Sequence, residues 1–169
     1  MRQRERTFRV FFVALLGLAT LLIASPISAQ NPTGLYVSSF GSNNVLQYDL
    51  DTGDFESVFV ESVAAVLDGP WYNAFGPDGN LYVSSFSTDS VVRYDITTGA
   101  MIDVFVDPGI GGLDQPQDLT FGPNGDLYVN STGSDQILRY DGNTGAFVDV
   151  FVSADSGGLD EPVGLEFGP

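Results

Sequence analysis

Three side chains of this 169-residue sequence offer the oxygen atoms that are typical of a calcium site: Asn73, Asp118 and Glu161. Carboxylate and amide oxygens are the protein ligands that Ca²⁺ takes. The sequence contains no histidine and no cysteine, which excludes a Ser-His-Asp triad, a cysteine nucleophile, a histidine-ligated metal and a zinc finger. The chemistry open to the chain is therefore binding of a hard cation, or proton transfer by a carboxylate.

The charge balance also favours a cationic partner. The sequence has 22 acidic and 6 basic residues, for a net charge of −16. Four of those basic residues and one acidic residue lie within residues 1–9, which leaves two arginines against 21 carboxylates and a net charge of −19 after Gln30. Such a surface repels nucleic acid and anionic membranes, and it attracts Ca²⁺ or cationic ligands.

Residues 1–29 have the pattern of a secretory signal peptide. A start rich in arginine is followed by an apolar run over 10–24 and by a stretch of small residues that ends at Ala29. This order predicts a helical signal segment that is cleaved after Ala29. A retained membrane anchor is the alternative, but the run is shorter than the roughly 18 to 20 residues that a spanning helix needs. We expect a secreted or extracytoplasmic protein with no membrane contact after cleavage.

The chain after residue 30 repeats one unit of 46 residues. The clearest recurring strings are Leu-Tyr-Val at 35–37, 81–83 and 127–129, and Phe-Gly-Pro at 75–77, 121–123 and 167–169. Every step is 46 residues, with no insertion or deletion. We therefore divide the region 30–169 into units 35–80, 81–126 and 127–169.

Each unit is predicted to contain four short antiparallel strands. In one complete copy they cover residues 117–121, 127–131, 137–141 and 146–152, with Asn-Gly and similar turn signals between them. No helical period of 3.6 occurs after residue 30. A four-stranded repeat of this length is typical of a β-propeller blade. The predicted fold class is all-β, with propeller blades of four antiparallel strands preceded by the signal helix.

Three such repeats make an incomplete propeller. The first unit lacks a first strand, and the last one stops after an orphan first strand at 163–167. Closed propellers have about four to eight blades. Two explanations stay open: the sequence is a fragment of a longer protein, or two copies join into a six-bladed ring.

The spacing of charges gives a test of the strand pairing. Arg93 and Asp103 lie ten residues apart across a predicted hairpin, and so do Arg139 and Asp149. The first unit has neither charge at its two equivalent positions. Charges that are present together or absent together predict a cross-strand ion pair, and this pairing would occupy both arginines.

The repeat resembles a known group of propellers. The strings Gly-Pro-Asp-Gly-Asn-Leu-Tyr-Val (76–83), Val-Val-Arg-Tyr-Asp (91–95) and Leu-Asp-Gln-Pro (113–116) are similar to the NHL-repeat and SMP-30/gluconolactonase-like group. The resemblance covers the whole region after the signal segment and implies the blade type. Such blades serve lactonases, lyases and binding modules alike.

The resemblance carries two expectations about chemistry. The SMP-30-like enzymes hold a metal, often Ca²⁺, with Glu, Asn and Asp side chains at the mouth of the channel. The virginiamycin B lyase-like enzymes depend on a histidine, and this sequence has none. That departure argues against lyase chemistry.

The candidate site lies where one unit differs from the others. Trp71 and Tyr72 align with Gln117 and Asp118 of the next unit, and Asn73 occupies a strand position that is leucine in the other two. A buried amide needs a partner, so Asn73 is either hydrogen-bonded or coordinates a ligand. We predict that these five residues line a ligand site at the channel mouth.

A calcium site formed by Asn73, Asp118 and Glu161 is the more specific hypothesis, and ordinary variation at a blade edge is the alternative. No residue is assigned as catalytic. Recurring residues such as Asn43, Asp89 and Asp135 are predicted instead to cap turns by bonding their own backbone.

Two functions follow from these observations. The first is a non-catalytic scaffold that binds a protein or a small ligand. The second is a Ca²⁺-dependent hydrolase of the SMP-30/gluconolactonase type, in which the metal polarises a carbonyl and a carboxylate moves the proton. Calcium is the one cofactor considered, and the identity of the partner stays open.

Overall fold

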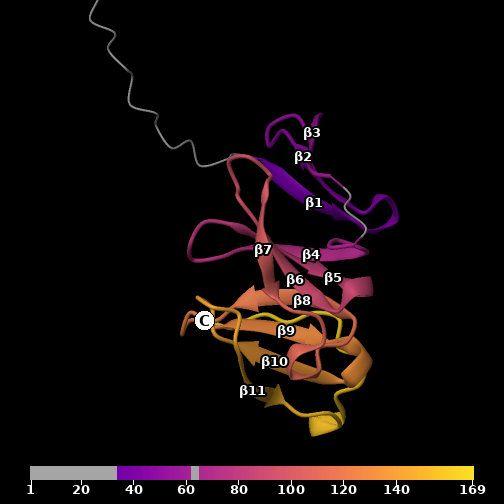
Figure 1. Ribbon diagram of the computed structural model, residues 1–169, viewed down its shortest axis with the longest axis vertical. Coiled ribbons are helices and arrows are strands. Elements are labelled where there is room, and N and C mark those ends of the chain that lie inside the picture. The colour runs from indigo at the N-terminus through magenta and orange to yellow at the C-terminus, as the bar shows by residue number, and fades with distance from the viewer. Residues whose placement is uncertain (1–33, 62–64) are drawn as a thin grey trace, which may run out of the picture. The chain divides into compact units, whose positions relative to one another are not determined.

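The computed structural model describes residues 34–61 and 65–169 (Figure 1). Regular structure in these two ranges consists of strands and short 3-10 turns, so the all-β prediction is confirmed for them. The predicted signal segment 1–29 lies outside the described residues. Within the described part of the chain, no helix is long and apolar enough to cross a membrane.

Eleven strands of five or six residues form three antiparallel sheets in the described ranges. The first sheet contains β1 (Leu35–Ser39), β2 (Asn44–Tyr48) and β3 (Phe55–Val60). The second contains β4 (Pro70–Phe75), β5 (Leu81–Ser85), β6 (Ser90–Tyr94) and β7 (Met101–Val106). The third contains β8 (Pro116–Phe121), β9 (Leu127–Ser131), β10 (Gln136–Tyr140) and β11 (Phe147–Val152). The strands of each sheet are adjacent in chain order, as short hairpin connections require.

Short 3-10 turns follow the strands at repeating positions. They are η1 (Phe40–Ser42), η2 (Phe86–Thr88), η3 (Ile110–Gly112), η4 (Thr132–Ser134) and η5 (Ser156–Gly158). Three of them, η1, η2 and η4, connect the strand that begins with Leu-Tyr-Val to the next strand of its sheet.

The four strands predicted within one repeat are confirmed as β8 to β11, to within one residue at most ends. The first sheet has three strands, as its missing first strand predicted. The strand predicted at 163–167 was wrong, because this segment is not in a ladder. A strand exists only when another strand accepts and donates its backbone hydrogen bonds, and the described residues offer this segment none.

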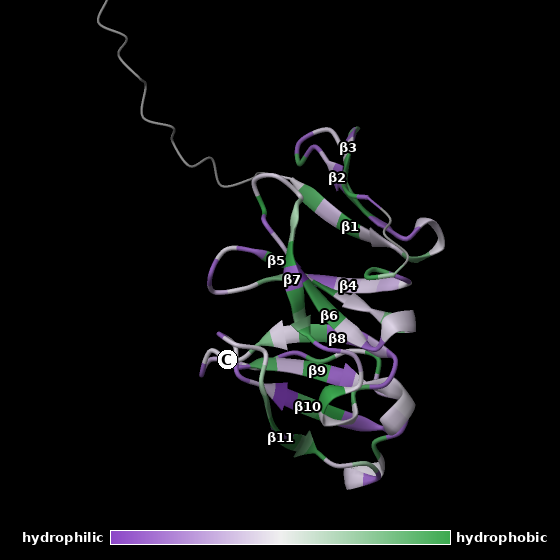
Figure 2. Cartoon of the chain, viewed as in Figure 1, coloured by the Kyte–Doolittle hydropathy of each residue, from purple (hydrophilic) through white to green (hydrophobic). Residues whose placement is uncertain are grey.

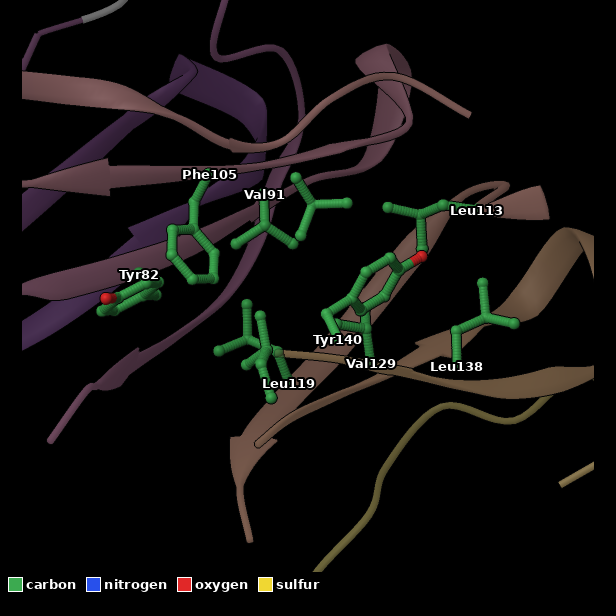
Figure 3. Close-up of a cluster of buried hydrophobic side chains, with 10 residues drawn as sticks. Tyr82, Val91, Phe105, Leu113, Leu119, Val129, Leu138 and Tyr140 are labelled. Atoms are coloured by element: carbon green, nitrogen blue, oxygen red, sulfur yellow. The ribbon is translucent and has the colours of Figure 1, made fainter. Parts of the chain in front are cut away.

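The hydrophobic core lies between successive sheets, in two clusters. One joins Tyr36, Val45 and Val60 of the first sheet to residues of the second. The other joins the second sheet to the third, where Leu119 and Tyr140 are fully buried. Figure 3 shows the labelled side chains of this second cluster pointing toward one another from the two sheets.

The middle sheet is covered on both faces, and its burial differs accordingly from that of the first sheet. β1 and β5 have the same sequence, Leu-Tyr-Val-Ser-Ser. All five residues of β5 are buried, whereas only Tyr36 is buried in β1. Figure 2 shows hydrophobic residues alternating with paler ones along β1. The burial of a strand in this fold therefore depends on its neighbours and not on its own sequence.

The predicted cross-strand ion pairs are confirmed. Arg93 is directly opposite Asp103, and its Nε and Nη2 donate to the two carboxylate oxygens at 3.1 and 2.6 Å. Arg139 is opposite Asp149 with the same two-pronged geometry. In the first sheet, the hydroxyl of Ser57 donates instead to its opposite residue, Gln47. Equivalent positions thus pair in all three sheets.

Replacing Arg93 with glutamine is expected to lower the free energy of unfolding by about 1 kcal/mol, because Asp103 then loses its charged partner. The double variant Arg93→Gln/Asp103→Ser copies the pair of the first sheet, and it should recover more than half of that loss. Urea denaturation of the three proteins measures both differences. A double variant less stable than the single one would contradict this interpretation of the pair.

Candidate functional site

The first strand of the second sheet contains a β-bulge. The pairing of β4 with β5 shifts between Pro70 and Asn73, so that β4 spans one residue more than its partner. Trp71 and Tyr72 form this bulge. A bulge bends its strand and redirects its side chains, and bulges are common beside binding sites. The positions at which the first unit differs from the others in sequence therefore coincide with the β-bulge of β4.

β8 carries the same bulge at Gln117 and Asp118, and a side chain of the neighbouring strand holds it in place. The Oδ1 atom of Asn130 in β9 accepts hydrogen bonds from both bulge N–H groups, at 3.1 and 2.6 Å. In the second sheet the hydroxyl of Ser84 accepts from the N–H of Tyr72 at 2.9 Å. These side chains supply the acceptors that the ladder no longer provides.

Asn130 and Ser84 were missed by the sequence analysis. The available signal was the string Leu-Tyr-Val-Asn-Ser in the third unit, where the other two have Leu-Tyr-Val-Ser-Ser. Among the described residues, the Nδ2 atom of Asn130 and the Oε1 atom of Gln117 are buried without a hydrogen-bond partner. The Nδ2 atom is a donor and the Oε1 atom is an acceptor. The β8 bulge therefore has one buried donor and one buried acceptor that make no hydrogen bond within the described chain.

The two bulges have opposite environments. Trp71 and Tyr72 are 44% and 46% exposed, whereas Gln117 and Asp118 are buried. The segment that follows Pro162 lies against the second bulge, where the N–H of Leu165 donates to Oδ2 of Asp118 at 2.8 Å. The predicted aromatic residues are therefore open to a ligand, and the predicted polar pair is covered.

Asp118 is a buried carboxylate held by backbone donors. Its Oδ1 atom accepts from the N–H of Leu119 at 2.8 Å, and its Oδ2 atom accepts from Leu165. Burial raises the pKa of Asp118, Glu166 raises it further, and the two N–H donors oppose the rise only in part. The carboxylate therefore fixes the segment after Pro162 to the third sheet.

The raised pKa of Asp118 predicts how stability changes with pH. A carboxyl group whose pKa is higher in the folded state contributes stability at low pH and loses that contribution as the pH rises through the folded pKa. The stability of the wild type relative to Asp118→Asn is therefore expected to fall as the pH rises from about 4, the ordinary pKa of an aspartate, through the higher pKa of the folded state, as measured by urea denaturation.

Asp95 is the control for this prediction. Thr98 and the backbone N–H of Thr97 hydrogen-bond its carboxylate and lower its pKa, so its contribution is present at neutral pH and lost as the pH falls. Asp95→Asn should thus give a difference that changes with pH in the opposite direction. Equal slopes for both variants would contradict the assignment.

Asn73 is hydrogen-bonded, which is one of the two roles predicted for it. Its Nδ2 atom donates to the hydroxyl of Ser38 at 2.9 Å. Ser38 belongs to β1, so the amide joins the second sheet to the first. The polar residue at a leucine position is therefore explained by a partner in the neighbouring sheet.

The three predicted calcium ligands make their contacts in different places. Asn73 bonds to the first sheet, Asp118 bonds to the segment after Pro162, and the N–H of exposed Glu161 donates to Asp135 at 2.8 Å. Among residues 34–61 and 65–169, no three His, Cys, Asp or Glu side chains are grouped so that they could hold a metal ion. The calcium site stays a prediction.

The recurring Asn and Asp residues join neighbouring sheets. Each lies at the end of a 3-10 turn with a left-handed φ between 50° and 57°. Each accepts, through Oδ1, the N–H of a residue 26 positions further along, in the loop that leads to the next first strand. These acceptors are Asn43, Asp89 and Asp135, and the donors are Gly69, Gln115 and Glu161. The predicted bond to the residue's own turn was wrong, because the Oδ1 atom of each side chain accepts from the next loop instead.

Three aromatic side chains gather beside these loops, and we call them the aromatic cluster: Phe40, Trp71 and Phe86. Their ring centroids are 5.2 Å apart for Phe40 and Trp71, 5.3 Å for Trp71 and Phe86, and 6.0 Å for the two phenylalanines. Phe40 is 49% exposed although it contacts both other rings. The N–H of Phe86 donates to the carbonyl of Gly69 at 3.0 Å, which fixes η2 against the loop before β4.

Trp71 was predicted from the sequence as a site residue, but the two phenylalanines were not. Phe40 and Phe86 recur at one repeat position, where the third unit has Thr132. In the third sheet, Gln117 takes the place of Trp71. The cluster therefore occurs only between the first and second sheets of the described chain.

Comparison with known proteins gives the fold and no family. No family model matches the sequence, and no curated protein matches it. Similar solved structures include hydrazine synthase from Kuenenia stuttgartiensis, at 23% identity and a TM-score of 0.58, with 73% of this chain and 34% of that one covered.

Two further similar structures are a catalytically inactive virginiamycin B lyase from Staphylococcus aureus with quinupristin and the glutaminyl cyclase of Myxococcus xanthus. For the lyase the identity is 13%, the TM-score is 0.55, and 68% of this chain and 36% of that one are covered. For the cyclase the values are 19%, 0.54, 71% and 49%. The chain thus spans between a third and a half of each protein. These neighbours are β-propeller proteins of varied function, and the described sheets have the fold of β-propeller blades.

Proposed function

We propose that the protein is an exported, non-catalytic β-propeller scaffold that binds an organic cation on its aromatic cluster. The observation that carries this proposal is the exposure of Phe40 and Trp71 at a position where the repeat is broken. Repeating aromatic pairs, such as Tyr82 with Phe105, pack in the core. The cluster is not part of either core cluster, so it is open to another role.

The charge of the chain supports a cationic ligand. Residues after Gln30 have a net charge of −19, and an acidic surface concentrates cations around it. The faces of aromatic rings attract ammonium and guanidinium groups. The two arginines of the described chain are both paired with carboxylates, and they lie over Phe105 and Phe151. Both arginines lie over rings outside the aromatic cluster, so a cation bound to the cluster would come from outside.

Trp71 makes the proposal testable, because it is the single tryptophan of the sequence. Its fluorescence is expected to change saturably on titration with choline. The neutral analogue 3,3-dimethylbutan-1-ol has the same shape without the charge, and should bind about five-fold more weakly, since a cation–π contact contributes about 1 kcal/mol. Equal responses to the two compounds would rule out recognition of the cation.

Two variants locate the binding. Phe86→Thr introduces the residue of the third unit, and should weaken choline binding while leaving Trp71 as the reporter. Phe55→Thr is the matched control, because Phe55 is 58% exposed in β3 and contacts Tyr48 instead of the cluster. The proposal fails if the two variants change the affinity equally.

A further inference from the structure

The first sheet has an apolar face and a strand edge whose counterparts in the second sheet are covered. Leu35 and Val37 of β1 are 52% and 37% exposed, whereas the equivalent Leu81 and Val83 of β5 are fully buried. Leu81 and Val83 pack against the first sheet and β5 also pairs with β4, whereas β1 has neither a sheet on the equivalent face nor a strand on the equivalent edge among the described residues. The sequence of β1 is therefore suited to a neighbour that the first sheet lacks.

The third sheet has the complementary open surface. Phe105 of the second sheet is 6% exposed, because the third sheet covers it, and its carbonyl oxygen lies against Gly145. Phe151, the equivalent residue of the third sheet, is 51% exposed. Gly53, the equivalent of Gly145 in the first sheet, has nothing within 4 Å of where a Cβ atom would be. In the contact between the second and third sheets, a phenylalanine packs against a glycine. Phe151 of the third sheet has no such glycine beside it, and Gly53 of the first sheet has no such phenylalanine.

The segment 163–167 completes the match. Phe167 packs edge-on against Tyr128 with 4.9 Å between ring centroids, as Phe121 does against Tyr82. The segment therefore lies where the first strand of a following sheet lies. It pairs with no strand, and Val163 is 64% exposed.

We propose that two copies of the chain associate head to tail, with the third sheet of each packed on the first sheet of the other. Segment 163–167 of one copy then pairs antiparallel with β1 of its partner. The repeat gives the register, because Asn73 is opposite Val83, and Leu119 is opposite Val129. A shift of 46 residues places Leu165 opposite the other copy's Val37.

A second copy is the occupant that the geometry favours. The three described blades alone do not make a ring, since closed propellers have about four to eight blades. Two copies that make the same heterologous contact twice would form a closed ring of six blades. An unpaired apolar edge of this kind is also the surface that strands of another chain add to.

Cysteine cross-linking tests the register directly, because the sequence contains no cysteine. Val37→Cys and Leu165→Cys proteins are mixed and oxidised, and a disulfide-linked heterodimer is expected, since opposite residues of a strand pair are close enough for a disulfide. Val37→Cys mixed with Glu166→Cys is the control, because a slip of one residue turns the side chain to the other face. The expected yield is at least about five-fold lower for the control pair, and equal yields would overturn the register.

Light scattering tests the association without cross-links. The wild type is expected to contain two chains per particle and Val37→Lys one, because the lysine would bury an unpaired charge in the apolar contact between the copies. Ile102→Lys is the matched control: Ile102 is 44% exposed in β7, within a sheet that has neighbours on both faces. A wild type that stays monomeric at all concentrations, or a dimeric Val37→Lys protein with wild-type circular dichroism, would overturn the proposal. Choline binding is measured on the same samples, so that failure of the assembly is distinguished from failure of the ligand site.

Discussion

Asn130→Ala is expected to lower the free energy of unfolding by about 2–4 kcal/mol, because it leaves two buried N–H donors of the β8 bulge without an acceptor. The donors are the backbone groups of Gln117 and Asp118, at 3.1 and 2.6 Å from the Oδ1 atom of Asn130. All three residues are buried, so water would not replace the lost bonds without opening the sheet. Urea denaturation measures the difference.

Asn130→Ser is the control for this prediction. It introduces the residue that the second sheet has at this position, where the hydroxyl of Ser84 accepts the N–H of Tyr72. We expect it to cost about 1 kcal/mol, because one acceptor remains. If alanine and serine destabilise the protein equally, the side chain at position 130 does not hold the bulge.

Leu119→Asn is expected to cost about 3–5 kcal/mol, because it removes packing from a fully buried position and adds an amide there. Leu119 belongs to the core cluster between the second and third sheets (Figure 3). Asn73 has Ser38 as its partner, and the equivalent partner for an asparagine at position 119 would be Ser84 of the second sheet. The hydroxyl of Ser84 already accepts from the N–H of Tyr72 and donates to the carbonyl of Gln117, so it is not free to bond the new amide.

The reciprocal change, Asn73→Leu, is expected to change stability by no more than about 1 kcal/mol, since one hydrogen bond is lost and apolar burial is gained. Thermal unfolding of the two variants gives the comparison. A larger loss for Asn73→Leu than for Leu119→Asn would show that the two equivalent positions differ for another reason.

The strands and the ion pairs were predictable because local patterns determine them. The ten-residue spacing of Arg93 and Asp103 fixes their places on opposite sides of one hairpin, and turn signals fix the hairpin itself. The side chains that accept hydrogen bonds from the bulge N–H groups were not predictable in this way. Ser84 is part of a string that occurs identically in β1, and its role depends on a shift in the neighbouring strand.

Contacts between sheets were the second kind of feature that the sequence did not reveal. Asn43 looked like a residue that caps its own turn, and its side chain binds Gly69, which is 26 residues away. Phe40 and Phe86 recur at one position in two of the three units, and that recurrence does not indicate whether the rings are buried or exposed. The exposure of Phe40 depends on the sheets that surround it, and single-residue patterns do not contain that information.

The decisive measurement is calorimetric titration of choline into a variant in which each residue of the aromatic cluster is replaced by its equivalent around the third sheet, which is Thr132 or Gln117. The changes are Phe40→Thr, Trp71→Gln and Phe86→Thr. Because Phe40 and Trp71 are exposed and the cluster lies outside both core clusters, the variant is expected to retain wild-type circular dichroism and a similar unfolding midpoint. We predict that it binds no detectable choline at concentrations that saturate the wild type. A folded variant that binds choline with an affinity equal to that of the wild type would contradict the account.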